Sequence, residues 1–175
     1  MDHDLGYHAR VLFEPWPLRS LTAPNRVVRA ATYEGLASRA GVPSPELGDL
    51  YARLATNEVG TIVTGFCFVA RRGRAMQPRQ AGIDDDEKIP AWVEVVRRVR
   101  ATGRETVLLM QLAHTGLQTR RSALGGKRPL APGRYVSPYF RTRPRVMREG
   151  DVLAAVEAFG EAARRARDAG FDGVE

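Results

Sequence analysis

"GTIVTGFCFV", residues 60–69, is an apolar run in which polar and apolar residues do not alternate. A strand that is exposed on one face alternates, whereas a strand buried on both faces reads as a continuous apolar run. "TVLLMQL", residues 106–112, is a second run of the same kind. Both runs are typical of strands in a parallel sheet that is covered by helices, and we expect them to be two strands of one such sheet.

Helical patterns lie before, between and after these two strands, each with apolar residues at helical spacing. The first begins at Ser44, a residue type that caps the free amides of a helix. The second follows the acidic run 84–87, whose charges suit the positive end of a helix dipole, and ends at Gly103. The third begins with Asp151 as its cap and is stopped by Gly170.

Two further strands complete the pattern. "RVVRAAT", residues 26–32, follows a turn at Pro24, and "FDGVE", residues 171–175, begins a fourth strand. Strands that alternate with helices predict right-handed crossovers and a parallel sheet, either a doubly wound sheet or part of an eight-stranded (β/α)8 TIM-type barrel. The paired turns in residues 11–25 predict a small hairpin that closes the N-terminal end of a barrel.

Composition excludes several classes of protein. The chain is 43% hydrophobic and 27% charged, which is typical of a globular domain. It has no apolar run of the roughly 18–20 residues that cross a bilayer, so we expect no membrane partner. The acidic N-terminus does not resemble a signal peptide and Cys67 is the single cysteine, which together predict a cytoplasmic protein. We expect Cys67 to lie in the core, and no residues are spaced as metal ligands.

The segment 115–148 contains nine basic residues and no acidic one, in a chain whose net charge is +7. One interpretation is an anion-binding flap for phosphate, a nucleotide or nucleic acid. The other is a solvated loop whose acidic partners lie elsewhere in the fold. Only Tyr135, Tyr139 and Phe140 offer stacking surfaces within it, so we expect no nucleic-acid partner.

In a parallel α/β fold, ligands bind where the strands end at their carboxyl edge. The residues at the ends of the three predicted strands are therefore candidates: Ala30, Ala31, Thr32 and Tyr33, then Gly65, then Gln111 with His114 in the loop beyond. Small residues among them allow a flat ligand to lie close to the backbone.

Gln111 and His114 each have two interpretations. Gln111 places a carboxamide in an apolar strand, where it can pair with the O=C–N–H edge of a pyrimidine-like ring or make a structural bond to a neighbouring strand end. His114 is a ligand contact or a general acid, or else a histidine that a loop carbonyl satisfies. The sequence leaves these alternatives open.

Three segments, taken together, resemble the N-terminal part of the Old Yellow Enzyme family, the FMN-dependent NADH:flavin oxidoreductases and ene-reductases. They are "LFEPWPLRSLTAPNRVVRAATYEG", "QLAHTG" and "AARRARDAGFDGVE". The resemblance covers residues 11–175. It implies a (β/α)8 barrel with FMN across its carboxyl mouth, NADH or NADPH as hydride donor, and an activated alkene or related small molecule as acceptor.

The resemblance also implies roles for individual residues. Ala30, Ala31, Thr32 and Tyr33 would line the flavin mainly through their backbone, Gly65 would pass close to the ring, and Gln111 would bond its pyrimidine edge. Gly35 falls where some members place a substrate-facing tyrosine, and His114 would also face the substrate. The segment "HTGL" lacks the arginine of the family's related segment.

The family's catalytic pair, His/Asn or His/His, and a nearby tyrosine would follow Glu175. The resemblance thus implies that residues 1–175 are the N-terminal portion of one FMN-binding barrel domain, about four β/α units that stop in strand four. We expect such a portion to be inactive by itself. The alternative is a non-catalytic half-barrel module that completes itself as a homo-oligomer or with a partner chain.

Overall fold

A four-stranded parallel sheet organises the fold in this computed structural model, which describes residues 11–175. Its order is β10-β6-β4-β3. The strands are β3 (Val28–Arg29), β4 (Thr61–Val63), β6 (Val107–Met110) and β10 (Gly173–Val174). Each strand lies beside the next one along the chain, whereas a doubly wound sheet reverses its order at a switch point. The sheet is therefore part of a (β/α) barrel, and the doubly wound alternative is wrong.

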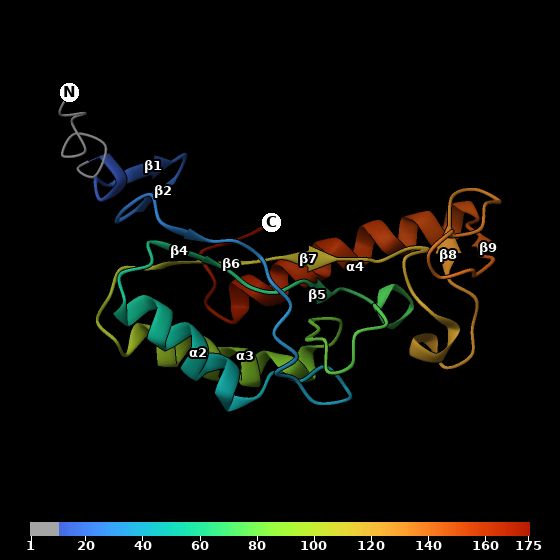
Figure 1. The fold of residues 1–175 in the computed structure, drawn as a ribbon, viewed down its shortest axis with the longest axis horizontal. Coiled ribbons are helices and arrows are strands. Elements are labelled where there is room, and N and C mark those ends of the chain that lie inside the picture. The colour runs from blue at the N-terminus through green and yellow to red at the C-terminus, as the bar shows by residue number, and fades with distance from the viewer. Residues whose placement is uncertain (1–10) are drawn as a thin grey trace, which may run out of the picture.

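Three helices connect and cover these strands: α2 (Pro45–Thr56), α3 (Ile89–Arg100) and α4 (Glu149–Asp168). Helices α2 and α3 lie side by side along the same side of the sheet (Figure 1). Side chains alternate along the strands, so Ile62 and Leu108 enter the core beneath the helices. Thr61 and Val107, one position earlier in each strand, face the opposite side, which is the interior side of a barrel.

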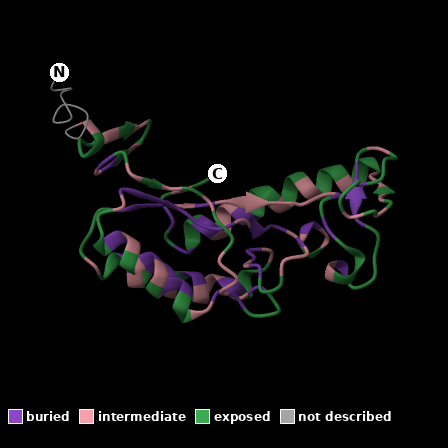
Figure 2. Ribbon diagram, in the orientation of Figure 1, coloured by how far each residue is buried: buried purple, intermediate pink, exposed green. Residues whose placement is uncertain are grey.

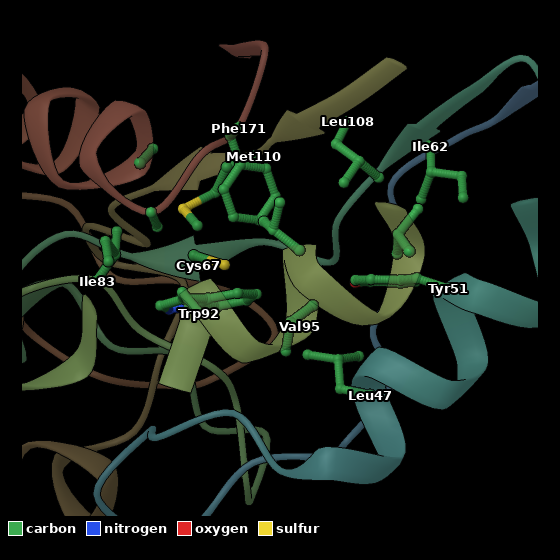
Figure 3. Close-up of a cluster of buried hydrophobic side chains, with 14 of the residues drawn as sticks. Leu47, Tyr51, Ile62, Cys67, Ile83, Trp92, Val95, Leu108, Met110 and Phe171 are labelled. Carbon is green, nitrogen blue, oxygen red and sulfur yellow. The ribbon is translucent and has the colours of Figure 1, made fainter. Parts of the chain in front are cut away.

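The core lies between the sheet and the helices, where Figure 2 shows most of the buried residues. Trp92 of α3 is its largest fully buried side chain. The indole nitrogen of Trp92 donates to the Gly82 carbonyl at 3.0 Å, and its ring meets Phe171 edge-on with centroids 5.6 Å apart. Phe171 lies two residues before β10, so this contact holds the fourth strand against α3 (Figure 3).

Two strands that the sequence predicts as continuous are interrupted. Strand β4 is followed by β5 (Cys67–Phe68) and β6 by β7 (Leu112–Ala113), and the two short strands pair in parallel. At the break, the Thr64 hydroxyl accepts the Gln111 backbone N–H at 3.1 Å and donates to the Gly65 carbonyl at 2.9 Å. The Thr64 side chain thus takes the place of a backbone acceptor for the Gln111 N–H, and the two strand segments on either side of the break kink at the same level.

The ends of the barrel segment carry different structures. The predicted hairpin is confirmed: β1 (Trp16–Leu18) and β2 (Leu21–Ala23) pair antiparallel. The long loop after β7 contains a parallel pair that was not predicted, β8 (Leu130–Ala131) with β9 (Arg145–Val146). Three 3-10 turns, η1 (Arg71–Gly73), η2 (Asp86–Lys88) and η3 (Arg121–Leu124), lie in loops. Figure 1 shows the hairpin and the β8–β9 pair at opposite ends of the molecule.

Ser44 is the N-cap residue of α2, as predicted, whereas the prediction that Asp151 is the N-cap of α4 is wrong. The Ser44 side chain makes no capping bond, and its buried hydroxyl has no partner among residues 11–175. Helix α4 begins at Glu149, two residues before Asp151. The Asp151 carboxylate accepts the Arg148 backbone N–H at 2.8 Å and pairs with Arg145, so it caps the helix from inside its first turn. No helix in the described part of the chain is long and apolar enough to cross a membrane.

Candidate active site

The predicted site residues lie at the carboxyl ends of three neighbouring strands. Ala30 directly follows β3, Gly65 lies two residues beyond β4, and Gln111 directly follows β6. These strands are parallel neighbours, so their ends share one edge of the sheet. His114 follows β7 and extends the same edge. The structure therefore brings together segments that are about 80 residues apart in the sequence.

The segment after β3 is open to solvent. Ala30, Thr32 and Tyr33 are exposed and Ala31 is half-buried. Within residues 11–175, the backbone amides of Thr32 and Tyr33 donate to no protein group, so they are available to the heteroatoms of a ligand. The Tyr33 hydroxyl donates to the Pro78 carbonyl. Its ring lies over Gly35, where a Cβ would come within 3.0 Å of the phenol oxygen.

Gln111 makes the structural bond that one of its two interpretations requires. Its side-chain Nε2 donates to a carboxylate oxygen of Glu175, on the neighbouring strand end, at 3.3 Å. Its register places the side chain on the face opposite the helices, because Leu108 and Met110 of the same strand enter the helix-covered core. The residue is half-buried, and no donor to its carbonyl oxygen is present among the described residues. This oxygen is free to bind a ligand.

Glu34 is the residue at this edge that the sequence did not single out. One of its carboxylate oxygens, Oε1, accepts the Tyr51 hydroxyl at 2.5 Å and the Gly65 backbone N–H at 3.0 Å. The same oxygen lies 2.9 Å from the Arg29 guanidinium. One carboxylate therefore ties together the loop after β3, the end of β4 and helix α2. The available signal was the pair of opposite charges, Arg29 and Glu34, on either side of a predicted strand end.

Arg29 extends this cluster to the backbone. Its guanidinium donates to the Val63 carbonyl at 2.6 Å and to the Thr32 carbonyl at 3.1 Å, and it lies over the Tyr51 ring at 5.5 Å from the centroid. Both carbonyls belong to residues at the carboxyl edge. Hence the Arg29–Glu34 ion pair holds in place the backbone segment that contains the exposed amides of Thr32 and Tyr33.

Burial controls the ionisation of two groups near this cluster. Burial and the negative charge of Glu34 raise the pKa of Tyr51 well above its usual value, so its hydroxyl remains a donor. Burial also raises the pKa of Cys67 to about 12. Cys67 is fully buried, which confirms the prediction of a core residue. A thiol in this state is not a nucleophile at neutral pH.

Gly65 is surrounded by the groups that Glu34 organises. A Cβ at this position would overlap the Glu34 carboxylate and would lie 2.6 Å from the Thr32 carbonyl oxygen. Its amide is bonded to Glu34, and its carbonyl accepts Thr64 and Cys67. The backbone of Gly65 is thus fully engaged by the protein.

His114 is held by a loop amide and not by the carbonyl that its structural interpretation predicted. Its Nδ1 accepts the Gly116 backbone N–H at 3.2 Å, which requires Nδ1 to be unprotonated. Its ring lies against the backbone of Gly73, where a Cβ would overlap it. Burial lowers the pKa of His114, and the charge of Arg72 adds to this effect.

The lowered pKa of His114 predicts how stability depends on pH. The unfolded chain binds a proton at about 6.5 and the folded chain only at lower pH, so the free energy of unfolding should rise with pH up to about 6.5. His114→Gln is expected to reduce this slope. Urea denaturation of both proteins between about pH 5 and pH 8 measures it. Identical slopes in the two proteins would contradict the assignment.

The sequence pattern of one family, described as the NADH:flavin oxidoreductase / NADH oxidase family, matches residues 11–175. An NADH:fumarate oxidoreductase of Klebsiella pneumoniae is 35% identical over 136 residues, covering 77% of this chain and 14% of that protein. A probable NADH-dependent flavin oxidoreductase of Bacillus subtilis is 32% identical, with 94% of this chain and 43% of that protein covered. The chain thus spans less than half the length of these relatives.

Solved structures agree with the parallel-barrel topology. The Old Yellow Enzyme homologue from Zymomonas mobilis superposes with a TM-score of 0.85 at 28% identity, covering 93% of this chain and 47% of that one. Morphinone reductase in complex with tetrahydroNAD superposes with a TM-score of 0.83 at 27% identity, covering 93% and 48%. The alignment spans about half of each barrel, as the four parallel strands also indicate.

Proposed function

Since this chain belongs to the NADH:flavin oxidoreductase / NADH oxidase family, we propose that it forms the flavin-binding edge of an FMN-dependent oxidoreductase. The proposed reaction transfers hydride from NADH or NADPH through FMN to an activated alkene or a related small-molecule acceptor. Residues 1–175 are proposed to belong to a single FMN-binding barrel domain. The observation that carries the proposal is the shared edge, where three parallel strand ends present open amides, a glycine and a carboxamide.

Each part of this edge fits one part of a flavin ring. The unbonded amides of Thr32 and Tyr33 are donors for ring heteroatoms, and Ala30 and Ala31 leave room above the backbone. Because the Gly65 amide is already bonded to Glu34, we assign Gly65 the role of a bare Cα surface against which a ring can lie. FMN, when bound, supplies a two-electron acceptor for hydride.

The remaining polar groups orient ligands in this proposal. The Gln111 carboxamide offers an acceptor and a donor to the imide edge of the ring. To bind the ring, its Nε2 would give up the long 3.3 Å bond to Glu175. Gly35 and His114 are proposed to face the acceptor. The Nε2 of His114 is the ring nitrogen left for a ligand, because its Nδ1 is engaged by the loop amide of Gly116.

Flavin titration tests this function. Purified chain is added to FMN, and in parallel to lumiflavin, which has the ring but no phosphate, and flavin fluorescence is followed. We expect both to bind, and Gln111→Leu to weaken each by about 10–100-fold, because an imide edge left unbonded costs about 1–3 kcal/mol. Gln118→Leu, in an exposed part of the loop after β7, is the matched control. Equal affinities for the Gln111 and Gln118 variants would refute the proposed role.

A second candidate, assembly of the chain into a completed barrel, is favoured by its apolar edges. Val28 of β3 and Val174 of β10, on the two outer strands of the described sheet, are 44% and 43% exposed. Val152 and Val156 on the first half of α4 are also exposed. The buried residues of α4, Ala162 and Ala166, lie in its second half. Light scattering at several chain concentrations distinguishes a self-associating module from a monomer.

A further inference from the structure

A pocket of about 350 Å³ lies beside the candidate active site and is lined by positive charge. Its cationic side chains come from three separate loops: Arg39 after β3, then Arg71, Arg72 and Arg74 after β5, and Lys127 after β7. Phe68 and Leu124, both buried, form apolar parts of its wall. Lys127 reaches this pocket from a turn at Gly125 and Gly126, both of which have a positive φ.

Carboxylates offset only part of the positive charge of this pocket. No acidic residue lines it. The nearest acidic group recorded is Asp84, which pairs with the buried Lys88 and lies 3.8 Å from Arg71. Lys88 and Arg71 share the Asp84 carboxylate, so this one negative charge leaves the five cationic side chains of the cavity with a net positive charge. Burial lowers the pKa of Arg74, the negative charge of Asp84 opposes this effect, and the positive charge of Arg71 adds a smaller lowering.

Two of the arginines are held in place by neutral acceptors. Arg74 donates to the Arg39 backbone carbonyl at 2.6 Å and stacks over Phe68 at 5.1 Å from the ring centroid. Arg72 donates to the Arg128 carbonyl at 2.8 Å. These bonds order the side chains without cancelling their charge. The conformational entropy of these side chains is therefore already lost in the free protein and does not oppose ligand binding.

One buried polar atom of a residue that lines the pocket has no partner. The Nε of Arg72 is buried and has no hydrogen-bond acceptor among residues 11–175. A buried, unpaired guanidinium N–H is costly, and an oxyanion that reached it from the pocket would satisfy it.

The pocket also contacts the edge that carries the proposed chemistry. Gly73, between Arg72 and Arg74, packs directly against the ring of His114. Thr115 donates through both its backbone N–H and its hydroxyl to the Gly73 carbonyl, at 2.9 and 3.0 Å. A group bound in the pocket would therefore lie one loop away from the strand ends.

We propose that this pocket binds a phosphate or pyrophosphate group of a small-molecule ligand whose other end reaches the strand edge. Planar guanidinium groups bind the oxygens of phosphate in pairs, and several of them converge here. Two sources share this chemistry: the phosphates of a nicotinamide dinucleotide and those of a phosphorylated acceptor. The site goes beyond the flavin chemistry and does not depend on it.

A second basic pocket, of about 560 Å³, lies nearby and serves as a comparison. Arg128, Arg134, Arg143 and Arg145 line it. Arg145 is neutralised there, because both of its terminal nitrogens bond the Asp151 carboxylate at 2.9 and 2.6 Å. Its lining holds no buried polar atom that lacks a partner. The second pocket is therefore also basic, but within the described residues it lacks the unpaired buried donor of the first.

Calorimetric titration of the chain with inorganic pyrophosphate tests the proposal. The double variant Arg39→Ala/Lys127→Ala removes two exposed side chains that make no hydrogen bond in the described structure, so the fold should be unaffected. We expect it to weaken pyrophosphate binding at least about tenfold, from the loss of two charge contacts. Arg53→Ala, at an exposed position of α2, and Arg134→Ala, in the second pocket, should bind as the unaltered chain does.

Competition identifies the source of the phosphate. If NADPH or NADH displaces bound pyrophosphate, the pocket binds the phosphates of the hydride donor. If pyrophosphate stays bound in the presence of NADPH and NADH, the pocket is assigned to a phosphorylated acceptor. Arg72→Ala is a second variant, aimed at the unpaired Nε, and should also weaken binding. Absence of saturable pyrophosphate binding, or equal binding by the double variant and Arg53→Ala, would overturn the proposal.

Discussion

Replacing Glu34 by alanine is expected to lower the free energy of unfolding by about 3–5 kcal/mol, the usual cost of removing one partner from a buried ion pair. The Glu34 and Arg29 side chains are only 10% and 16% exposed. Removing the carboxylate leaves the Arg29 charge unpaired and deprives the Tyr51 hydroxyl and the Gly65 amide of their acceptor. Urea denaturation followed by circular dichroism measures the change.

Two further variants separate the charge from the structure. Arg29→Met/Glu34→Leu replaces the ion pair by apolar side chains and should recover a large part of the lost stability, because the unpaired buried charge is gone. Glu157→Ala removes an exposed carboxylate from α4 and should change stability by less than about 0.5 kcal/mol. A Glu34→Ala protein as stable as Glu157→Ala would show that the carboxylate does not hold the strand edge together.

Gly65→Ala is expected to destabilise the fold by about 3 kcal/mol, at the upper end of the cost of overpacking. The new Cβ would overlap the Glu34 carboxylate and would lie 2.6 Å from the backbone oxygen of Thr32. The carboxylate can rotate away, but the Thr32 carbonyl is fixed by its bond from Arg29. We therefore also expect flavin binding to fall, since the segment that carries the open amides must shift.

Gly160→Ala is the matched control, because a Cβ at this position of α4 meets nothing within 4 Å. It should be neutral or stabilise the helix by up to about 1 kcal/mol. Combining Gly65→Ala with Glu34→Ala tests the contact that the two residues share. We expect the double variant to lose less free energy of unfolding than the sum of the losses of the two single variants. Strict additivity would mean that the two residues do not press on each other.

The order of strands and helices was predictable because it depends on local pattern. Continuous apolar runs indicated buried parallel strands, and Gly103 ends α3 as expected, with a positive φ of 71° just beyond the helix. The pairing of the strands in chain order was not predictable from the pattern, because doubly wound sheets and (β/α) barrels have the same alternation of strands and helices. The strand pairing and the resemblance to a known family separated the two.

The site was predictable only in part. Strand ends could be located, so Gly65 and Gln111 were correctly placed at the carboxyl edge of the sheet. Glu34 was not, because its role depends on Arg29 and Tyr51, which approach it only once β3, β4 and α2 have packed. The kink at Thr64 and the β8–β9 pair also depend on partners distant in sequence, as does the basic pocket, whose charges come from three loops.

The central claim, that a flavin ring lies on the carboxyl edge of β3, β4 and β6, is tested most directly by NMR. Titration of isotope-labelled chain with FMN, followed in nitrogen–proton spectra, reports each amide and the side-chain NH₂ of Gln111. The account predicts that shifts concentrate at residues 30–35, at 64–66 and at the Gln111 side chain. Shifts confined to other parts of the chain, with the Gln111 NH₂ unmoved at saturation, would contradict it.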